Sequence, residues 1–317
     1  MRSYSLIAPA KINLYLEIIG DRPDGYHELA MVLQSIDLAD RLQIAPNSIQ
    51  GFRIHCDNPQ VPTNETNLAY RAAKLMQDRF PSVFDRYGGA DITLDKQIPI
   101  AAGLAGGSTD AAAVLVGLNL LWKLGLTQPE LQDLASEIGS DVPFCIAGGT
   151  ALATGRGSDL EPLPDVDSLH LVLAKYRDLA VSTPWAYQTY RQQFGSTYIS
   201  EAKDLEGRRK RVHSGSMLSA IAQGDGEKIA QLLHNDLEKV VLPAYPQVLK
   251  LREAFEECDI LGTMMSGSGP SVFAIAHSRQ KAEQAREKVK AAIADPNLDL
   301  WVAKFINTGI QLASQVP

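Results

Sequence analysis

The chain has 317 residues, of which 45% are hydrophobic and 21% are charged, and its formal net charge is -7. This length supplies two domains or one large one, and the composition argues against a disordered chain and against a coiled coil. The negative charge argues against general nucleic-acid binding, because a protein that follows phosphates needs a cationic surface.

The longest nearly apolar run, residues 111–122, is shorter than the roughly 20 residues that span a bilayer, and Lys11 interrupts the N-terminus before a signal-peptide core can form. We therefore expect no membrane association and place the protein in the cytoplasm, or in a plastid-like stroma if it is processed. The cysteines Cys56, Cys145 and Cys258 show no metal-ligand spacing, so free thiols are expected.

Residue patterning in the first half predicts strands followed by helices. Period-two alternation indicates a strand over residues 12–18, and the glycine- and proline-rich residues 20–25 end it. The hydroxyls of Ser108 and Thr109 are expected to open a long buried helix, and Gly125 is expected to cap its end. Further strands are expected at residues 42–44, 52–56 and 92–94, and helices at residues 67–80, 108–124 and 129–138.

The polar, turn-rich residues 161–165 indicate a domain boundary, which gives domains over residues 1–163 and 164–317. The order of elements in the second half predicts a small α+β sandwich. The basic run at residues 208–211 is interpreted as a solvated loop. The second half is expected to contain strands at residues 169–174, 263–265, 272–276 and 301–305, and helices at residues 184–193, 227–237, 245–257 and 280–294.

A glycine-rich loop lies between a predicted strand and the long helix. Glycines let backbone N–H groups crowd an anion, and the helix N-terminus adds the positive end of its dipole. The loop is therefore a candidate phosphate cradle, although it has neither the lysine of a Walker loop nor the spacing of a dinucleotide fingerprint. A tightly packed turn is the alternative. Its residues are Pro99, Ile100, Ala101, Ala102, Gly103, Leu104, Ala105, Gly106, Gly107, Ser108 and Thr109.

Three further segments carry candidate chemistry, and each also has a plain structural explanation. A second glycine-rich loop at residues 266–271 is either a simple turn or a wall that closes over a transferred group. Lys11 begins an alternating strand, where a solvated edge charge is common. Asp141 directly precedes an apolar run, where it can cap a helix.

Taken together, these segments resemble the GHMP kinase superfamily, named for galactokinase, homoserine kinase, mevalonate kinase and phosphomevalonate kinase. The resemblance is carried by residues 9–14 (Pro-Ala-Lys-Ile-Asn-Leu), the loop at 103–109 and the loop at 262–271. More narrowly, three segments resemble the branch that phosphorylates a cytidine-diphosphate-linked methylerythritol. They are residues 23–29 (Pro-Asp-Gly-Tyr-His-Glu-Leu), 139–144 (Gly-Ser-Asp-Val-Pro-Phe) and 182–184 (Ser-Thr-Pro), and the resemblance covers nearly the whole chain.

The resemblance implies a two-domain α+β GHMP kinase fold. Its N-terminal half would resemble domain 2 of ribosomal protein S5, its C-terminal half would be a ferredoxin-like sandwich, and the active site would lie between them. The implied reaction is ATP-dependent phosphorylation of the 2-hydroxyl of the methylerythritol unit, giving the 2-phosphate and ADP, in the non-mevalonate route to isopentenyl diphosphate. Mg²⁺ is expected with ATP. The expected partner is the small-molecule substrate, without nucleic acid, and the expected state is a monomer or homodimer.

The resemblance also assigns roles. Asp141 is the expected general base, and Lys11 is expected to offset charge on the transferred phosphoryl group. The triphosphate is expected along residues 99–109, where Ser108 or Thr109 would reach the metal, and no carboxylate ligand is assigned. Asn67 and Lys96 are expected near the nucleobase. The expected substrate-binding residues are Asn13, Tyr26, His27, Thr183, Tyr187, Gly267, Ser268 and Gly269, with Trp185 as the alternative to Tyr187.

Two other functions remain open at this stage. Another GHMP kinase, acting on mevalonate or homoserine, would use the same cradle but would not need the pair Tyr26 and His27 to hold a cytosine. The second open function is that of a non-catalytic nucleotide-binding protein of the same fold. The presence of both Lys11 and Asp141 argues against it.

Overall fold

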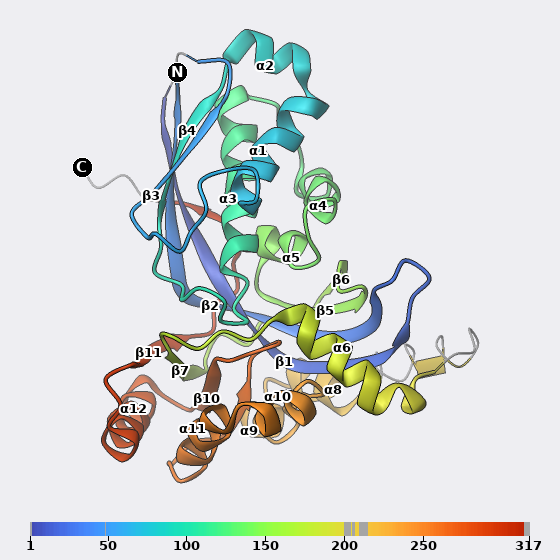
Figure 1. Cartoon of the computed structure of the whole chain (residues 1–317), viewed down its shortest axis with the longest axis vertical. Coiled ribbons are helices and arrows are strands. Elements are labelled where there is room, and N and C mark those ends of the chain that lie inside the picture. The colour runs from blue at the N-terminus through green and yellow to red at the C-terminus, as the bar shows by residue number, and fades with distance from the viewer. Residues whose placement is uncertain (1, 48, 200–203, 205–206, 209–214, 314–317) are drawn as a thin grey trace.

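The computed structural model of the protein describes residues 2–47, 49–199, 204, 207–208 and 215–313. Figure 1 shows two sheets with helices packed on each. This mixture of strands and helices confirms the α+β class predicted from the sequence. Residues 209–211 of the basic run lie outside the described part, and Arg208 donates from Nε to Glu17 Oε1 at 2.9 Å. No helix in the described ranges is long and apolar enough to cross a bilayer.

The first sheet is built on two long antiparallel strands, β1 (Tyr4–Asp21) and β2 (His27–Pro46). Their register shifts after Pro9, Asn13 and Ile18, and such irregularities bend and twist a strand pair. The pair therefore runs through the upper part of the molecule and then lies along the second sheet (Figure 1). The sheet also contains β3 (Phe52–Cys56), β4 (Ala90–Asp95), β5 (Thr150–Gly155), β6 (Asp159–Pro162), β8 (His234–Asn235) and β12 (Gln311–Leu312).

Helices cover one face of the first sheet (Figure 1). The central one, α3, is buried on nearly all sides, as expected of a helix without a polar face. Trp122 at its end packs against Phe52 and Phe84 with ring centroids 6.2 and 6.1 Å away. The helices are α1 (Leu68–Arg79), α2 (Pro81–Tyr87), α3 (Gly106–Trp122), α4 (Gln128–Ser136) and α5 (Val142–Ala147).

The second sheet is antiparallel, in the order β11-β7-β10-β9. It confirms the α+β sandwich predicted for the second half. Its strands are β7 (His170–Tyr176), β9 (Gly262–Met265), β10 (Val272–Ala276) and β11 (Leu298–Lys304). The helices of this half are α6 (Thr183–Phe194), α8 (Ser216–Ala222), α9 (Gly226–Gln231), α10 (Glu238–Ala244), α11 (Pro246–Glu256) and α12 (Arg279–Ile293), with a 3₁₀ turn at Gly195–Thr197.

The second half of the chain also contributes to the first sheet. β8 and β12 both pair with β1, on which Leu6 pairs with Leu312 and Tyr15 pairs with His234. Residue 163 follows β6 and precedes the strands of the second sheet. A boundary there assigns β8 and β12 to the second half of the chain, although both belong to the first sheet. The division into residues 1–163 and 164–317 stays a prediction.

The ends of α3 differ from those predicted. The helix begins at Gly106 after Ala105, which adopts left-handed backbone angles of φ 58° and ψ 29°. The hydroxyls of Ser108 and Thr109 therefore lie inside the helix and do not cap it. At the other end the residue that caps the helix is Lys123 and not Gly125, although both have a positive φ, because the N–H of Lys123 closes the last turn on the carbonyls of Asn119 and Leu120.

The helix predicted over residues 227–237 is also wrong. α9 ends at Gln231, and His234 and Asn235 pair with β1 before α10 begins. Apolar residues in this stretch recur at a helical spacing, but hydrogen bonds to β1 determine its conformation. Most of β2 was not predicted either, and its residues 28–36 lack the alternating pattern because they are buried on both faces of the sheet. The helices α2, α5, α8 and α10 were also missed.

We expect Ala105→Gly to increase the free energy of unfolding. A left-handed alanine costs about 1–2 kcal/mol, and glycine removes this cost while adding about 0.5–1 kcal/mol of backbone entropy to the unfolded chain. The net gain should be about 0.5–1 kcal/mol in urea unfolding. Ala111→Gly, inside the same helix, should instead lose about 1 kcal/mol. Equal losses in both variants would contradict this account.

Candidate active site

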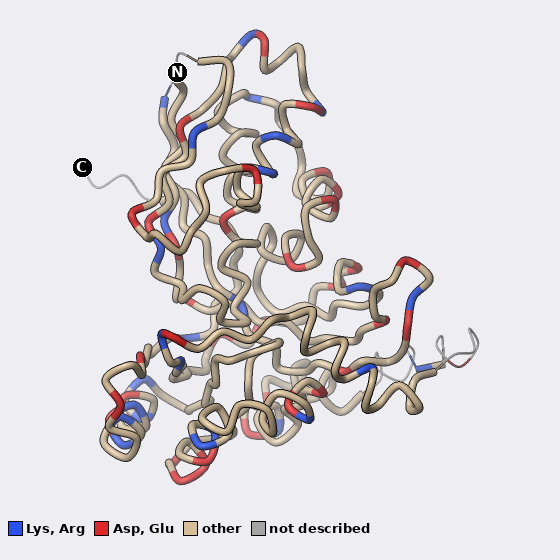
Figure 2. The backbone as a smooth tube through the Cα atoms, viewed as in Figure 1, with Lys and Arg blue, Asp and Glu red and all other residues tan. Residues whose placement is uncertain are grey.

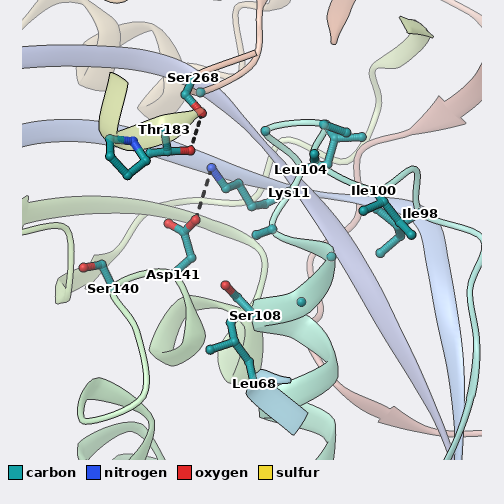
Figure 3. Close-up of a pocket in the computed structure, with 18 of the residues that line it drawn as sticks. Lys11, Leu68, Ile98, Ile100, Leu104, Ser108, Ser140, Asp141, Thr183 and Ser268 are labelled. Atoms are coloured by element: carbon teal, nitrogen blue, oxygen red, sulfur yellow. Dashed lines mark hydrogen bonds and ion pairs between the residues drawn. The ribbon is translucent and has the colours of Figure 1, made fainter. Parts of the chain in front are cut away.

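A cavity of about 740 Å³ opens between the β1–β2 pair, the N-terminus of α3 and the loop that joins β9 to β10. The glycine-rich loop at residues 99–108 forms one side of it. Side chains from β1, α6 and the residues before α5 complete the wall, as Figure 3 shows. Segments that are far apart in the sequence therefore meet in one place.

Lys11 and Asp141 converge in this cavity. The Lys11 side chain is 6% exposed, and its Nζ lies 3.5 Å from Asp141 Oδ2 (Figure 3). The same amine donates to Asn13 Oδ1 at 2.8 Å, which fixes its position on β1. Asp141 directly precedes α5, and within the described structure its carboxylate does not cap that helix. The carboxylate faces Lys11 and remains 30% exposed, so a ligand in the cavity can reach it.

The glycine-rich loop directs backbone N–H groups into the cavity. The first hydrogen bond of α3 runs from Thr109 N to Ala105 O, so the N–H groups of Gly106, Gly107 and Ser108 precede the hydrogen-bonded turns. All three residues line the cavity. The positive end of the dipole of this 17-residue helix lies at the same point. The arrangement fits a phosphate chain, and the backbone bond from Lys11 N to Leu104 O at 3.1 Å connects the loop to β1.

The two glycine-rich loops touch each other. A Cβ on Gly103, which has φ +74°, would lie 2.2 Å from the carbonyl oxygen of Ser266, and a Cβ on Gly267 would lie 3.2 Å from the carbonyl oxygen of Gly103. Ser266 Oγ donates to Gly103 O at 3.1 Å. Thr183 Oγ1 and Ser268 Oγ share a hydrogen bond of 2.7 Å beside Lys11 (Figure 3). Glycine at both positions is what allows this close approach.

Lys96 holds the start of the first loop through two buried ion pairs. Its amine contacts Asp40 and lies 2.6 Å from Asp110 Oδ2 on α3. Asp40 Oδ1 also accepts the N–H groups of Gln97 and Ile98 at 2.6 and 2.8 Å. β2, the loop and α3 are thereby joined at one point. Burial raises the pKa of Asp110 to about 7, because desolvation and Asp40 together outweigh the attraction of Lys96.

Aromatic side chains form the outer wall of the cavity. The His27 ring lies 5.1 Å from Tyr187, and Tyr26 is 55% exposed with the Arg156 guanidinium 5.9 Å from its ring centroid. Trp185, the alternative to Tyr187, packs instead against another tyrosine of the C-terminal half. Desolvation lowers the pKa of His27, so the ring is neutral near pH 7. Its Nε2 is buried, has no hydrogen-bond partner among the described residues and lies 3.9 Å from Asp21 Oδ1.

Comparison with known proteins assigns the family. Residues 67–149 match the model of the GHMP kinases N terminal domain, and residues 217–295 match that of the GHMP kinases C terminal domain. The chain is 64% identical to the 4-diphosphocytidyl-2-C-methyl-D-erythritol kinase of Gloeothece citriformis over 98% of this chain and 99% of that one. With the enzyme of the same name from Nostoc punctiforme the identity is 63% over the full length of both. The chain belongs to the 4-diphosphocytidyl-2-C-methyl-D-erythritol kinase family of GHMP kinases.

Solved structures agree with this family. The crystal structure of a 4-(cytidine 5'-diphospho)-2C-methyl-D-erythritol kinase is 31% identical, with a TM-score of 0.71 over 95% of this chain and 98% of that one. The structure of a homoserine kinase from Cytophaga hutchinsonii is 19% identical over 99% of this chain and 98% of that one, with a TM-score of 0.74. At this identity the similarity shows a shared fold and nothing about function. The predicted two-domain GHMP kinase fold is confirmed, and the protein is an ATP-dependent kinase.

The kinase cavity contains every site residue predicted from the sequence except Thr109 and Gly269. Thr109 is fully buried in α3, and its assignments to ATP and to a metal stay predictions. A Cβ on Gly269 would lie 2.5 Å from Met265 Sδ, and the assignment of Gly269 to the substrate also stays a prediction. Sequence reasoning missed Arg156, although a cation between Gly155 and Gly157 was a visible signal.

We expect Asp110→Asn to reduce the pH dependence of kinase stability. The folded-state pKa of Asp110 lies above its ordinary 3.8, so its contribution to stability is most favourable at low pH and declines as the pH rises toward 7. The free energy of unfolding should therefore decline less between pH 4 and pH 7 in the variant than in the wild type. The difference between the two declines should exceed about 1 kcal/mol. The exposed Asp133→Asn should keep the wild-type slope. An unchanged slope in Asp110→Asn would refute the pKa assignment.

Proposed function

We propose that the protein transfers the terminal phosphoryl group of ATP to the 2-hydroxyl of 4-diphosphocytidyl-2-C-methyl-D-erythritol. The products are the 2-phosphate and ADP, in the non-mevalonate route to isopentenyl diphosphate. The observation that carries the proposal is that Lys11 and Asp141 meet in one cavity with the first-turn amides of α3 and the aromatic wall at His27. The relatives that match the full chain carry the name of this kinase.

Asp141 and Lys11 divide the chemistry of the transfer. An alkyl hydroxyl is a weak nucleophile at neutral pH, so a carboxylate that accepts its proton speeds the attack. Asp141 is the carboxylate beside the Lys11 amine, and it is open to the cavity. Lys11 offsets negative charge on the phosphoryl group in the transition state. Asn13 keeps the Lys11 amine oriented through its 2.8 Å hydrogen bond, so little reorganisation is needed.

ATP occupies the first loop in this proposal. The N–H groups of Gly106, Gly107 and Ser108 hold the phosphates, and the nucleobase lies toward Asn67 and Lys96. Magnesium accompanies ATP and, when bound, neutralises the oxygens of its terminal phosphates. The Ser108 hydroxyl is the side-chain group that would contact the magnesium ion. The described residues hold no cluster of three or more His, Cys, Asp or Glu that fits a metal, which suits an ion held mainly by phosphates and water.

The aromatic wall is assigned to the cytosine of the substrate. Tyr26 and Tyr187 supply ring faces for stacking, and His27, which also lines the cavity, supplies a polar contact for the base. Thr183, Gly267 and Ser268 close the cavity on the side of the transferred group. A mevalonate or homoserine kinase has no use for such a wall.

The remaining parts of the proposal concern compartment and partners. We assign the protein to the cytoplasm, and its free cysteines agree with a reducing compartment. It acts as a monomer or homodimer on a small molecule. Figure 2 shows Lys and Arg interleaved with Asp and Glu along the helices, a distribution that does not favour a nucleic-acid partner.

A coupled assay tests the function. The purified protein with ATP, magnesium and 4-diphosphocytidyl-2-C-methyl-D-erythritol should release ADP, and phosphorus NMR should show a new monoester at the 2-position. Mevalonate and homoserine should release none. ADP release with either of these and none with the cytidyl substrate would refute the proposed substrate.

We expect Asp141→Asn to lower kcat by about 10²- to 10⁴-fold, because the amide cannot accept the proton of the hydroxyl. Affinity for ATP, measured by calorimetry, should stay near that of the wild type, because the amides of the first loop are unchanged. Asp133→Asn, the same substitution at an exposed position, is the control and should turn over normally. A kcat in Asp141→Asn equal to that of this control would remove the base assignment.

A further inference from the structure

We propose that Asn235 is a positioning residue for the second glycine-rich loop, residues 266–271, and that residues 235–238 hold this loop against β1. This inference rests on the proposed function, because the loop is part of the cavity in which the transfer takes place. Asn235 itself does not line the cavity and touches neither substrate nor ATP in this arrangement.

Asn235 uses its two amide hydrogens to contact the loop and the last residue of β9, from which the loop starts. The residue is 4% exposed, and its Nδ2 donates to the carbonyl oxygens of Met265 and Gly267, each at 2.8 Å. Its Oδ1 accepts the N–H of Leu237 at 3.0 Å, which fixes the orientation of the amide. Both amide hydrogens and the oxygen of this buried side chain are hydrogen-bonded, so the carbonyls of Met265 and Gly267 are held in one favourable position.

Glu238 supports the last residue of β9, directly before the loop. Its Oε1 accepts the N–H of Met265 at 2.9 Å, so the two polar groups of Met265 are held by two residues of one segment. Arg252 on α11 approaches the other oxygen of Glu238, Oε2, at 3.5 Å. Because these contacts come from a short segment, the loop cannot shift without displacing it.

Asp236 anchors this segment to β1. Its N–H donates to Leu16 O at 3.0 Å, and its Oδ2 accepts the N–H of Ile18 at 2.8 Å. Burial opposes ionisation of Asp236, but hydrogen bonds from His234, Lys239 and the Ile18 N–H lower its pKa to about 2. The anchor is therefore charged at neutral pH. β1 is also the strand that carries Lys11 and Asn13, so residues 235–238 set the distance between that strand and the loop.

The contact at Gly267 determines where the loop directs its amide. In a trans peptide the carbonyl of one residue and the N–H of the next point in opposite directions. Since the Gly267 carbonyl points to buried Asn235, the Ser268 N–H points away from Asn235, toward the side on which Ser268 lines the cavity. Among the described residues this N–H donates to no acceptor. Asn235 thus presents a backbone donor to an anionic group in the cavity.

The test compares two Asn→Asp variants by kinetics and by hydrogen exchange. Asn235→Asp removes both donors and places a carboxylate against two carbonyls. We expect kcat/KM for the cytidyl substrate to decrease about 10- to 100-fold, because the second loop and its Ser268 N–H lose their fixed position. In the absence of ligands, the amides of residues 266–269 and 271 should exchange faster than in the wild type, since the 2.9 Å bonds from Ser266 N and Gly269 N depend on the loop conformation.

The matched control is Asn119→Asp. Asn119 also donates from Nδ2 to a backbone carbonyl, that of Leu126 at 3.1 Å, and accepts the N–H of Leu126, but it lies outside the cavity. This variant should lose stability without a change in kcat/KM or in the exchange of residues 266–271. If Asn235→Asp does not fold, Asn235→Ala removes the amide without adding charge and takes its place.

The outcomes separate the inference from the function on which it rests. A wild-type protein that does not phosphorylate the cytidyl substrate refutes the proposed function. Loop exchange still decides the positioning role in that case: faster exchange confined to the Asn235 variants supports it. Exchange at residues 266–271 equal to that of Asn119→Asp, or a kcat/KM equal to that of this control in an active enzyme, overturns it.

Discussion

A lysine amine removed from water requires a carboxylate and a fixed acceptor nearby, and this requirement organises the centre of the molecule. For Lys11 the carboxylate is that of Asp141 and the acceptor is Asn13 Oδ1. The backbone N–H of Lys11 also donates to Leu104 O in the first glycine-rich loop. The strand, the loop and the start of α5 are therefore not independent. Moving any one of them would expose or isolate a buried charge, so the geometry of the transfer reaction and the stability of the fold depend on the same contacts.

Contact between the two glycine-rich loops extends this constraint to the second sheet. Gly103 and Gly267 let two backbones approach more closely than any side chain would permit. The second loop is held from behind by Asn235 and Glu238, and the first by Lys96 with its two acids. Each loop is thus fixed from the protein interior, which leaves its N–H groups free to face a ligand. Rigid donors of this kind stabilise developing charge without reorganisation.

Sequence reasoning identified the residues that act through local chemistry. Lys11, Asp141 and the first glycine-rich loop are recognisable because their residue types and spacing carry the signal. The partners of Lys96 are not, since Asp40 and Asp110 lie 56 and 14 positions away and only folding brings them together. Residues 28–36 of β2 gave no period-two pattern because they are buried on both faces of the sheet. The stretch before α10 has apolar residues at a helical spacing, but its hydrogen bonds to β1 make it a strand.

The pairing of β12 with β1 has a consequence for synthesis of the chain. Leu6 and Ile7 are made long before their neighbours on one side of the sheet, Gln311 and Leu312. Until those later residues leave the ribosome, that edge of the nascent sheet has unpaired backbone groups of the kind that other chains can bind. Residues 311–312 therefore close an edge that residues 6–7 leave open for most of the synthesis of the intervening chain.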